Sequence, residues 1–344
     1  MKHRTIINIF TGLALAAAVA VIALISIILT GKSHLYNAAD RIVQGNNCDG
    51  DKTNEAVIFN REPYVYKKGL INILILGIDG EGNLYDNHSP GDMGQSDAVY
   101  VVSIDTQSKA THVVGIPRDT MTTIEMSDKD GNTVAVNTGQ VTLQYGYGQD
   151  IQQCTSLMAK SVSGILYNIH IDRVVVLSVN SIALINDAVG GVTVTIENDF
   201  TDESGEVLDE AFVKGNTIHL TGEQARLFVQ ERDCNVAESA MDRLLRQEQY
   251  MQALEPLLYK KVRKNPFLIM KIIKELKSND MLYTDMTNAE IVYVFFQIAE
   301  SDFNMDSIIT IPGKVKKGIR YEEYYTDNES LKKLIMQIFY LPVD

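Results

Sequence analysis

The feature that most constrains this chain is a long apolar stretch near its start. Residues Thr5–Thr30 carry no charged side chain, and a helix of about 20 apolar residues crosses the hydrocarbon core of a bilayer. The stretch is longer than the apolar core of an ordinary secretory signal peptide. We therefore expect a retained transmembrane helix. The alanine-rich segment LALAAAVA within it leaves a cleaved signal peptide as the alternative.

The charges before this stretch predict its orientation. Lys2 and Arg4 precede it without any acidic residue, and positive residues favour the cytoplasmic side of a membrane. The remainder of the chain would then lie outside the cell, attached to the cell membrane by a single pass. We expect three parts: a cytoplasmic tail and anchor at residues 1–31, a polar stalk at 32–68 with a short helix near Ala38–Val43, and an extracellular domain at 69–344.

The overall charge limits the classes of partner. The chain has 31 Lys and Arg residues, 44 Asp and Glu residues and a formal net charge of −13. Such a surface argues against nucleic acid as a partner and against a dedicated patch for anionic lipids. An anionic substrate would therefore need a local cluster of basic residues, which makes the positions of the arginines informative.

The cysteines indicate no covalent framework. Cys48, Cys154 and Cys234 are odd in number and widely spaced, a pattern that fits neither a set of disulfides nor a zinc site. We expect buried or free thiols.

Apolar runs and helical periods alternate along the extracellular part. The run LINILILGI at residues 70–78 is typical of a strand that is buried on both faces. Further strands are predicted at 98–105, 110–116, 173–179 and 192–196. Helices are predicted at 151–167, 182–188, 243–258, 266–277, 288–300 and 328–340. The alternation predicts an α/β domain with a helical C-terminal third, arranged as one domain rather than two.

Two spacings mark the beginnings of helices. Thr221 stands three residues before Gln224, and Thr287 stands three residues before Glu290. In such capping boxes the threonine and the Gln or Glu side chain each bind a backbone N–H of the first turn. We therefore expect helices to begin directly after Thr221 and Thr287.

Polar residues gather next to three of the predicted strands. Asp79 ends the first strand, Asp97 opens the second, and Pro117-Arg118-Asp119 follows the third. Ligands of open α/β sheets bind at strand ends, carboxylates are ligands for Mg²⁺, and an arginine fork suits phosphate. The alternatives are a turn cap at Asp79, a strand start at Asp97 and a local ion pair between Arg118 and Asp119.

A second set of candidate residues lies in the helical part. Arg243 and Gln247 are four residues apart, so both project from one face of a predicted helix near its N-terminus. The helix dipole favours an anion at that end, and Arg232 in the preceding loop can reach the same place. The alternative is a solvated basic face that pairs with Glu238 and Asp242.

Seven segments, taken together and in order, resemble the LytR–CpsA–Psr family of bacterial cell-envelope proteins. They lie within residues 70–344 and read INILILGID, QSDAVYVVSID, GIPRDT, QVTLQYGYG, HIDRVVVLSVNSIALINDAVGGVTVTI, LTGEQARLFVQERDCNVAESAMDRLLRQEQYMQAL and IPGKVKKGIRYEEYYTDNESLKKLIMQIFY. Any one of them is a weak signal. Their shared order behind a single apolar N-terminal stretch makes the resemblance specific.

The resemblance implies a fold and an activity. It implies a three-layer α-β-α fold with a central mixed sheet, and a membrane-anchored phosphotransferase that moves a glycopolymer from a polyprenyl-pyrophosphate carrier to peptidoglycan as a phosphodiester. By position, Asp79 and Asp97 would hold Mg²⁺ against the pyrophosphate. An apolar groove between sheet and helices would take the polyprenyl tail. The residues expected to bind substrate are Arg118, Asp119, Arg232, Arg243 and Gln247, and those expected to be catalytic are Arg118, Asp97 and Asp79, with Asp79 or Asp119 as the general base.

Several positions depart from the family pattern. Glutamines stand where the family has arginines before Ser-Asp and in its Arg-x-Arg, namely at Gln95 and Gln230. Gln140 and Thr142 replace Lys and Asn, and Ala240 and Asp242 replace Asp and Gly. The site is therefore poorer in positive charge than the family pattern, which leaves two alternatives to the transferase: a non-catalytic membrane-tethered regulator or lipid-pyrophosphate-binding protein, and a hydrolase in which water replaces the sugar hydroxyl.

Overall fold

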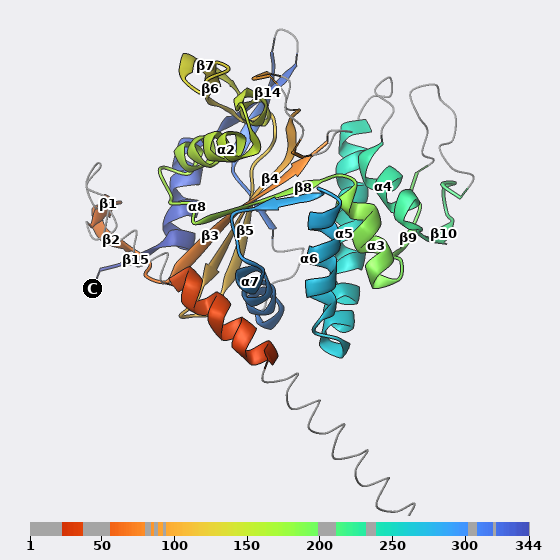
Figure 1. The fold of residues 1–344 in the computed structure, drawn as a ribbon. Coiled ribbons are helices and arrows are strands. Elements are labelled where there is room, and N and C mark those ends of the chain that lie inside the picture. Colours follow the sequence, from red (N-terminus) through yellow and green to blue (C-terminus); the bar gives the residue numbers. More distant parts are fainter. Residues whose placement is uncertain are drawn as a thin grey trace, which may run out of the picture.

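A six-stranded mixed sheet forms the centre of the protein, whose structure is a computed structural model (Figure 1). The structure describes residues 23–36, 56–79, 84–85, 89–91, 94–198, 211–231, 239–301, 308–318 and 321–343. In spatial order, the strands of the sheet are β11 (Leu282–Thr284), β8 (Arg173–Ser178), β3 (Leu70–Ile78), β4 (Ser96–Asp105), β5 (Thr111–Gly115) and β12 (Ile308–Thr310).

The sheet combines parallel and antiparallel pairs around β3. Strand β3 runs parallel to β8 and antiparallel to β4, while β12 runs parallel to β5. The apolar run of β3 is buried along both faces. Leu74 and Leu76 contribute to one apolar cluster, and Ile71 and Ile73 contribute to another. The predicted doubly buried strand is confirmed, because both faces of the sheet are covered.

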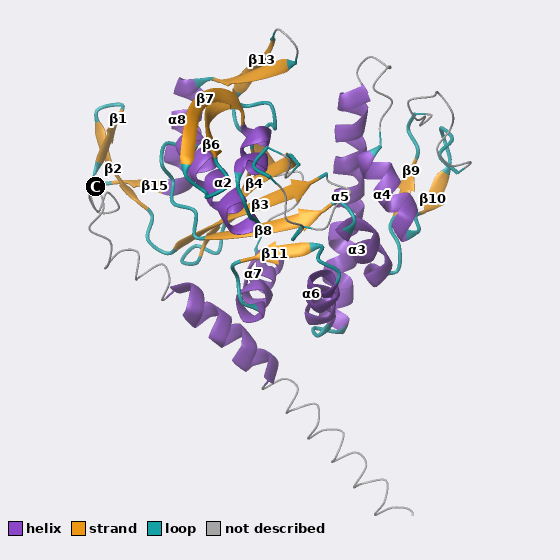
Figure 2. Ribbon diagram, turned by 45° about the horizontal axis from the view of Figure 1, so that its top comes forward, coloured by secondary structure: helices purple, strands orange, loops and turns teal. Residues whose placement is uncertain are grey.

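Helices form the two outer layers (Figures 1 and 2). One face of the sheet packs against the 3-10 helix η1 (Val141–Tyr147), α2 (Ile151–Ile165) and α8 (Asn328–Phe339). The other face packs against α6 (Leu268–Ser278), α7 (Asn288–Glu300) and the N-terminal helix at residues 23–36. The predicted α/β class with a central mixed sheet is confirmed.

A group of elements that is mostly helical follows β8 along the chain and flanks the sheet. It comprises α3 (Ser181–Val189), β9 (Thr193–Thr195), β10 (Thr217–His219), α4 (Gly222–Gln230) and α5 (Ser239–Lys264). Its own apolar cluster includes Phe212, Phe228 and Tyr250. Helix α3 ends at Gly190, whose φ of 84° lies in the left-handed region that glycine adopts easily. Both predicted capping boxes are confirmed, at the beginnings of α4 and α7.

Two hairpins at the edge of the domain did not appear among the predicted elements. They are β6 (Met121–Ser127) with β7 (Thr133–Gln140), and β13 (Gly313–Lys317) with β14 (Glu322–Thr326). Strand β7 has no buried residue, so neither face of it imposes an apolar alternation on the sequence. The hairpin β6–β7 turns where Asp128 accepts backbone hydrogen bonds from Asp130 and Asn132.

The segment predicted as a stalk contributes strands to the domain. Strand β2 (Glu62–Tyr66) pairs on one side with β1 (Val57–Phe59) and on the other with the C-terminal strand β15 (Tyr340–Pro342). The two ends of the domain therefore meet in one small sheet. The short helix predicted near Ala38–Val43 lies outside the described residues.

The N-terminal helix at residues 23–36 packs onto α7. Leu35 is 2% exposed, and an added Cβ at Gly31 would lie 2.1 Å from the carbonyl oxygen of Ala289. Most of the predicted anchor, residues 5–22, lies outside the described residues. Within the part of the chain that is described, none of the helices combines the length and apolarity needed to cross a bilayer.

Of the three cysteines, only Cys154 lies in the described part of the chain. It is buried in α2 and free, as predicted, and burial raises the pKa of its thiol to about 12. Cys48 and Cys234 lie outside the described residues.

Candidate functional site

The first two strands of the sheet bring two carboxylates together. Ile78, the last residue of β3, pairs with Ser96 at the beginning of antiparallel β4, next to a bulge. Asp79 directly follows Ile78, and Asp97 is the unpaired residue of the bulge, because Gly77 pairs with Ala98 and Ile78 with Ser96. Their side chains are close enough that the charge of Asp97 raises the pKa of Asp79. The bulge that leaves Asp97 unpaired lies beside the end of β3, which Asp79 directly follows.

Arg118 joins this edge from the turn after β5. Its Nη1 donates to Asp97 Oδ1, and its Nη2 donates to Gln95 Oε1 at 2.8 Å. The Arg118 side chain is 31% exposed. The turn that carries it is held by the hydroxyl of Thr120, which donates to the carbonyl of Pro117 at 2.6 Å. A cationic fork is therefore held at the strand edge and still reaches solvent.

Asp119 lies on the other side of the guanidinium. Its Oδ1 is 3.7 Å from Arg118 Nε and accepts a hydrogen bond of 2.9 Å from Gln140 Nε2. The same amide donates to the carbonyl of Glu322 at 2.8 Å. The local ion pair between Arg118 and Asp119 is thus present, together with a contact from Arg118 to Asp97.

Helices α4 and α5 close the site from the flank. Gln230, the last residue of α4, donates from Nε2 to Asp79 Oδ1 at 2.8 Å. Arg226, one helical turn earlier, donates to Gln230 Oε1, and this fixes which end of the amide faces Asp79. Arg243 in the first turns of α5 acts on Asp79 through its charge.

Although Asp79 lies near an arginine, its pKa is raised rather than lowered. Partial burial is the largest cause that raises the pKa of Asp79, and the charge of Asp97 raises it further. Arg243 and the hydrogen bond from Gln230 lower this pKa but do not cancel the rise. Two carboxylates facing each other disfavour double ionisation, a situation that a bound cation relieves.

The predicted residues do not all converge. Asp79, Asp97, Arg118 and Asp119 gather at one edge, and Arg243 lies within electrostatic range of Asp79. The Gln247 side chain donates instead to the carbonyl of Val229 at 2.9 Å. Arg232 lies outside the described residues.

Two arginines that the sequence reasoning did not single out support the site. Arg226 orients Gln230, and Arg246 donates to the carbonyls of Phe228 and Glu231 at the end of α4. The four-residue spacing of Arg226 and Gln230 was a usable signal for a shared helix face. The binding of Arg246 to α4 had no sequence signal, because the contact joins two helices.

The carboxylates at this edge supply only part of the ligands that a hard cation such as Mg²⁺ needs. Among the described residues, no three His, Cys, Asp or Glu side chains gather closely enough to hold a metal ion by themselves. Mg²⁺ is often bound by one or two carboxylates together with substrate phosphates and waters. Asp79 and Asp97 meet that requirement, and their mutual repulsion is an independent reason for a cation to bind between them.

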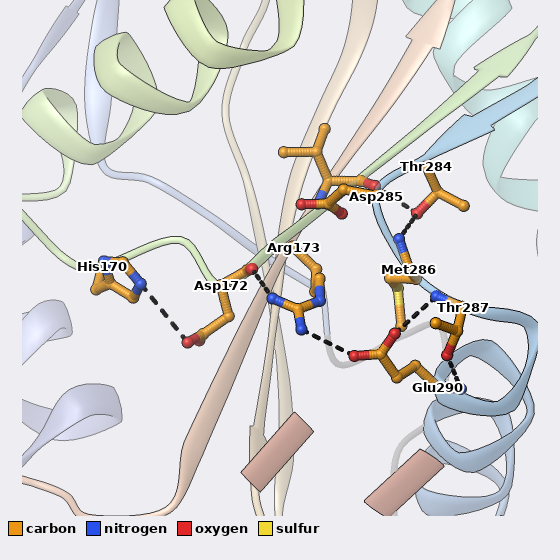
Figure 3. A network of polar contacts seen from close by, with 9 residues as sticks. His170, Asp172, Arg173, Thr284, Asp285, Met286, Thr287 and Glu290 are labelled. Atoms are coloured by element: carbon orange, nitrogen blue, oxygen red, sulfur yellow. Dashed lines mark hydrogen bonds and ion pairs between the residues drawn. The ribbon is translucent and has the colours of Figure 1, made fainter. Parts of the chain in front are cut away.

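A second polar cluster lies at the opposite edge of the sheet, where β3 and β8 begin (Figure 3). Arg173 donates to Glu290 Oε1 at 2.8 Å, and Glu290 also accepts from the backbone of Thr287 at 2.6 Å. Asp172 accepts from the backbone of Asn72 at 2.7 Å. The Glu290 side chain is 3% exposed. These contacts tie α7 to the sheet, although Arg173 Nε and Asn72 Oδ1 are buried without a hydrogen-bond partner.

The fold and the edge that carries Asp79, Asp97 and Arg118 define a mixed-sheet α/β protein with carboxylates and arginines clustered at strand ends. A model of the LytR_cpsA_psr family matches residues 29–338. The chain belongs to this family, in agreement with the resemblance of its seven segments.

Named relatives fall within the same family. The chain is 30% identical over 190 residues to the polyisoprenyl-teichoic acid–peptidoglycan teichoic acid transferase TagU of Bacillus cereus (strain AH820), which covers 55% of this chain and 53% of the relative. It is 28% identical over 221 residues to TagV of Bacillus subtilis (strain 168), which covers 61% of this chain and 49% of the relative. The chain thus spans about half the length of these relatives.

Solved structures share the fold. The crystal structure of B. subtilis TagV aligns with a TM-score of 0.55 at 22% identity and covers 79% of this chain and 96% of the other. A structure described as TagT bound to LIIa-WTA aligns with a TM-score of 0.55 at 19% identity and covers 83% and 95%. At these identities the likeness concerns the fold alone.

Proposed function

We propose that the protein is a membrane-anchored phosphotransferase that moves a glycopolymer from a polyprenyl-pyrophosphate carrier to a hydroxyl of peptidoglycan. The observation that carries this proposal is the convergence of Asp79, Asp97 and Arg118 at one strand edge, beside Arg243. Membership in the family and similarity to proteins named as teichoic acid transferases support the same reaction class.

The reaction exchanges one phosphate ester for another. The acceptor hydroxyl oxygen bonds to the phosphorus that carries the glycan, and the bond from that phosphorus to the bridging oxygen breaks. Polyprenyl phosphate leaves, and the hydroxyl proton passes to a carboxylate, for which Asp79 and Asp119 are the candidates. Positioning and charge stabilisation supply most of the catalysis in such a transfer.

Each residue of the site has a task in this scheme. Arg118 binds non-bridging phosphate oxygens with its planar fork, while Asp97 and Gln95 fix the plane of that fork. Arg243 adds positive charge near Asp79. Gln230 donates to one oxygen of Asp79 and thereby fixes the orientation of the carboxylate. Mg²⁺ held by Asp79 and Asp97 would neutralise charge on the pyrophosphate.

One observation favours the non-catalytic alternative. Gln95 and Gln230 already bind Arg118 and Asp79, so neutral amides hold groups that would otherwise meet the substrate. A protein with such a site could retain a lipid pyrophosphate without transferring its glycan. We therefore keep a membrane-tethered binding or regulatory protein as the second candidate function.

The test is a transfer assay with the full chain reconstituted in lipid nanodiscs. The reaction contains Mg²⁺, a polyprenyl-pyrophosphoryl saccharide and peptidoglycan oligomers, and products are followed by mass. Under the proposal, Arg118→Ala and Asp97→Ala each lower product formation about 100-fold or more. Lys160→Ala, which breaks an exposed ion pair with Glu125, serves as the control and leaves transfer unchanged.

The same assay separates the alternatives. Transfer that survives in both site variants contradicts the assignment of the site. Retention of the lipid pyrophosphate without product, unaltered by added Mg²⁺, favours the binding protein. Release of free glycan phosphate without a coupled product favours hydrolysis.

A further inference from the structure

Exposed cations gather at the turn between α5 and α6. Residues 260–274 contain six cations and no acidic residue, in a chain whose net charge is −13. All six side chains are exposed. We call this surface the basic turn; its cations are Lys260, Lys261, Arg263, Lys264, Lys271 and Lys274.

The fold turns these cations to the outside. In α6, Phe267, Lys271 and Lys274 follow the spacing of one helix face and are exposed. The other face is buried in an apolar cluster that includes Ile269, Ile272, Ile273 and Leu276. Phe267 stands at the tip of the turn, 41% exposed. The result is an outward surface of cations around one exposed aromatic ring.

Helix electrostatics explain only part of this surface. Cations are stabilised at the C-terminal end of a helix, where Lys261, Arg263 and Lys264 close α5. Lys271 and Lys274 lie instead near the middle of α6, beyond the first turn and the last turn in which the dipole acts, so the dipole does not explain them. Only Lys271 has a nearby acid on its own helix, with Nζ 3.7 Å from Glu275 Oε1. An anionic partner accounts for their placement better than the dipole does.

The N-terminal helix reaches the same end of the molecule. Figures 1 and 2 both place the residue 23 end of this helix on the side where α5 turns into α6. Leu24, Ile27 and Ile28 pack against the apolar cluster that α6 enters. On the opposite face, Ile25 is 50% exposed and Leu29 is 59% exposed. The end of this helix that adjoins the apolar N-terminal stretch therefore lies beside the basic turn.

We propose that the basic turn docks onto the anionic headgroups of the membrane in which the N-terminal segment is anchored. Clustered Lys and Arg side chains are attracted to anionic lipid surfaces. The Phe267 ring would enter the interface, and the long lysine stems would lie along it. The acidic composition of the whole chain argues against such a patch, but residues 260–274 form a local basic segment whose cations the fold leaves exposed.

This inference goes beyond the proposed reaction. Arg243 and Lys264 lie toward opposite ends of α5, and their separation of 21 residues corresponds to about 30 Å at 1.5 Å per residue. Changes in the basic turn therefore leave the candidate site intact. Contact with lipid can be measured without substrate, so failure of one proposal does not imply failure of the other.

The test uses tryptophan as a unique probe, because the chain has none. The full chain carrying Phe267→Trp is reconstituted in nanodiscs whose lipids have brominated acyl chains, either phosphatidylcholine alone or phosphatidylcholine with phosphatidylglycerol. Strong quenching is expected with phosphatidylglycerol, and it should weaken in 1 M salt, where the screening length falls to about 3 Å. Tyr321→Trp, at a position 70% exposed beside β14, is the matched probe and stays unquenched.

A charge reversal completes the test. Lys264→Glu, Lys271→Glu and Lys274→Glu are combined in the Phe267→Trp chain, and quenching should be lost while urea unfolding is unchanged. Lys129→Glu is the control and retains quenching. Equal quenching in neutral and anionic bilayers, no quenching at all, or a response to soluble poly(glycerol phosphate) but not to the bilayer would overturn the proposal.

Discussion

The two edges of the central sheet use the same kinds of side chain in opposite ways. At the edge where β3 and β8 begin, Arg173 and Glu290 are 17% and 3% exposed and bind each other. At the edge where β3 ends, Arg118 is 31% exposed, and Asp79 faces a second carboxylate. In the first arrangement the acid and the base are buried against each other, whereas in the second the guanidinium reaches solvent and two carboxylates face each other.

The pKa values of Glu290 and Asp79 shift in opposite directions. Burial opposes ionisation of Glu290, yet hydrogen bonds from Thr287 and Arg173 outweigh it and lower its pKa. Burial and a neighbouring carboxylate raise the pKa of Asp79. Perturbed carboxylates that lack a full set of partners are typical of functional sites, whereas paired ones stabilise the fold. An ion pair is therefore informative about function only together with its burial and its neighbours.

The largest expected effect comes from breaking the buried pair. Arg173→Met leaves the carboxylate of Glu290 buried without its cation, which should lower the free energy of unfolding by about 3 kcal/mol. Urea denaturation of the full chain measures this. The double variant Arg173→Met with Glu290→Gln should recover most of the loss, because no unpaired charge remains and the glutamine still accepts the capping bond from Thr287 N. A loss that persists undiminished in the double variant would show that the pair is not its cause.

Replacing Arg118 should have the opposite result: a large loss of transfer rate and a small change in stability. Arg118→Ala should lower the transfer rate about 100-fold, since one preorganised charge donor is lost. Its free energy of unfolding should change by less than about 1 kcal/mol, because the pair with Asp97 is partly solvated. Parallel rate and urea measurements test both statements. A large loss of stability with little loss of transfer would place Arg118 with the structural pair instead.

Replacing Gln230 should have an intermediate effect, and only on the transfer rate. Gln230→Leu removes the donor to Asp79 Oδ1, and a hydrogen bond to a charged group of about 1.5 kcal/mol corresponds to roughly tenfold in rate. Gln249→Leu removes a comparable bond to the carbonyl of Thr195, away from the site, and should leave transfer unchanged. Equal effects of the two variants would remove the special role of Gln230.

The smallest effect concerns stability against pH, and the contributions of Glu290 and Asp79 should differ in sign. The pKa of Glu290 is lowered on folding, so its contribution is present above its ordinary value of 4.5 and is lost as pH falls through the folded value. The pKa of Asp79 is raised, so its contribution is present below 3.8 and is lost as pH rises through the folded value.

Urea unfolding at several pH values tests this difference. Asp79→Asn should make the protein slightly more stable at pH 7 while it abolishes transfer, whereas Glu290→Gln should make it less stable. Equal destabilisation by both changes would contradict the contrast between the edges.

Much of the sheet followed from local sequence. The run at 70–78 predicted β3 because burial on both faces leaves no polar alternation, and the boxes at Thr221 and Thr287 predicted two helix beginnings through bonds made within one turn. The hairpin at 121–140 escaped prediction because exposed strands carry no apolar pattern. Its pairing depends on a turn and on contacts with distant residues.

The candidate site was predictable to the extent that strand ends determine it. Asp79, Asp97 and Arg118 were expected together because each adjoins a strand, and the sheet brings them to one edge. Gln247 shared a helix face with Arg243, yet its side chain binds the carbonyl of Val229. Helical spacing predicts direction around one helix, but it does not predict which neighbour occupies that direction.

By itself, the sequence determined the strands, the helix caps and the residues available for phosphate chemistry, because short-range sterics, hydrogen bonds and apolar periodicity act within a few residues. Only the tertiary structure decided which charges meet. Gln230 reaches Asp79 across 151 positions, and Glu290 neutralises Arg173 across 117. Such contacts depend on how elements pack, and that information is not contained in any local segment.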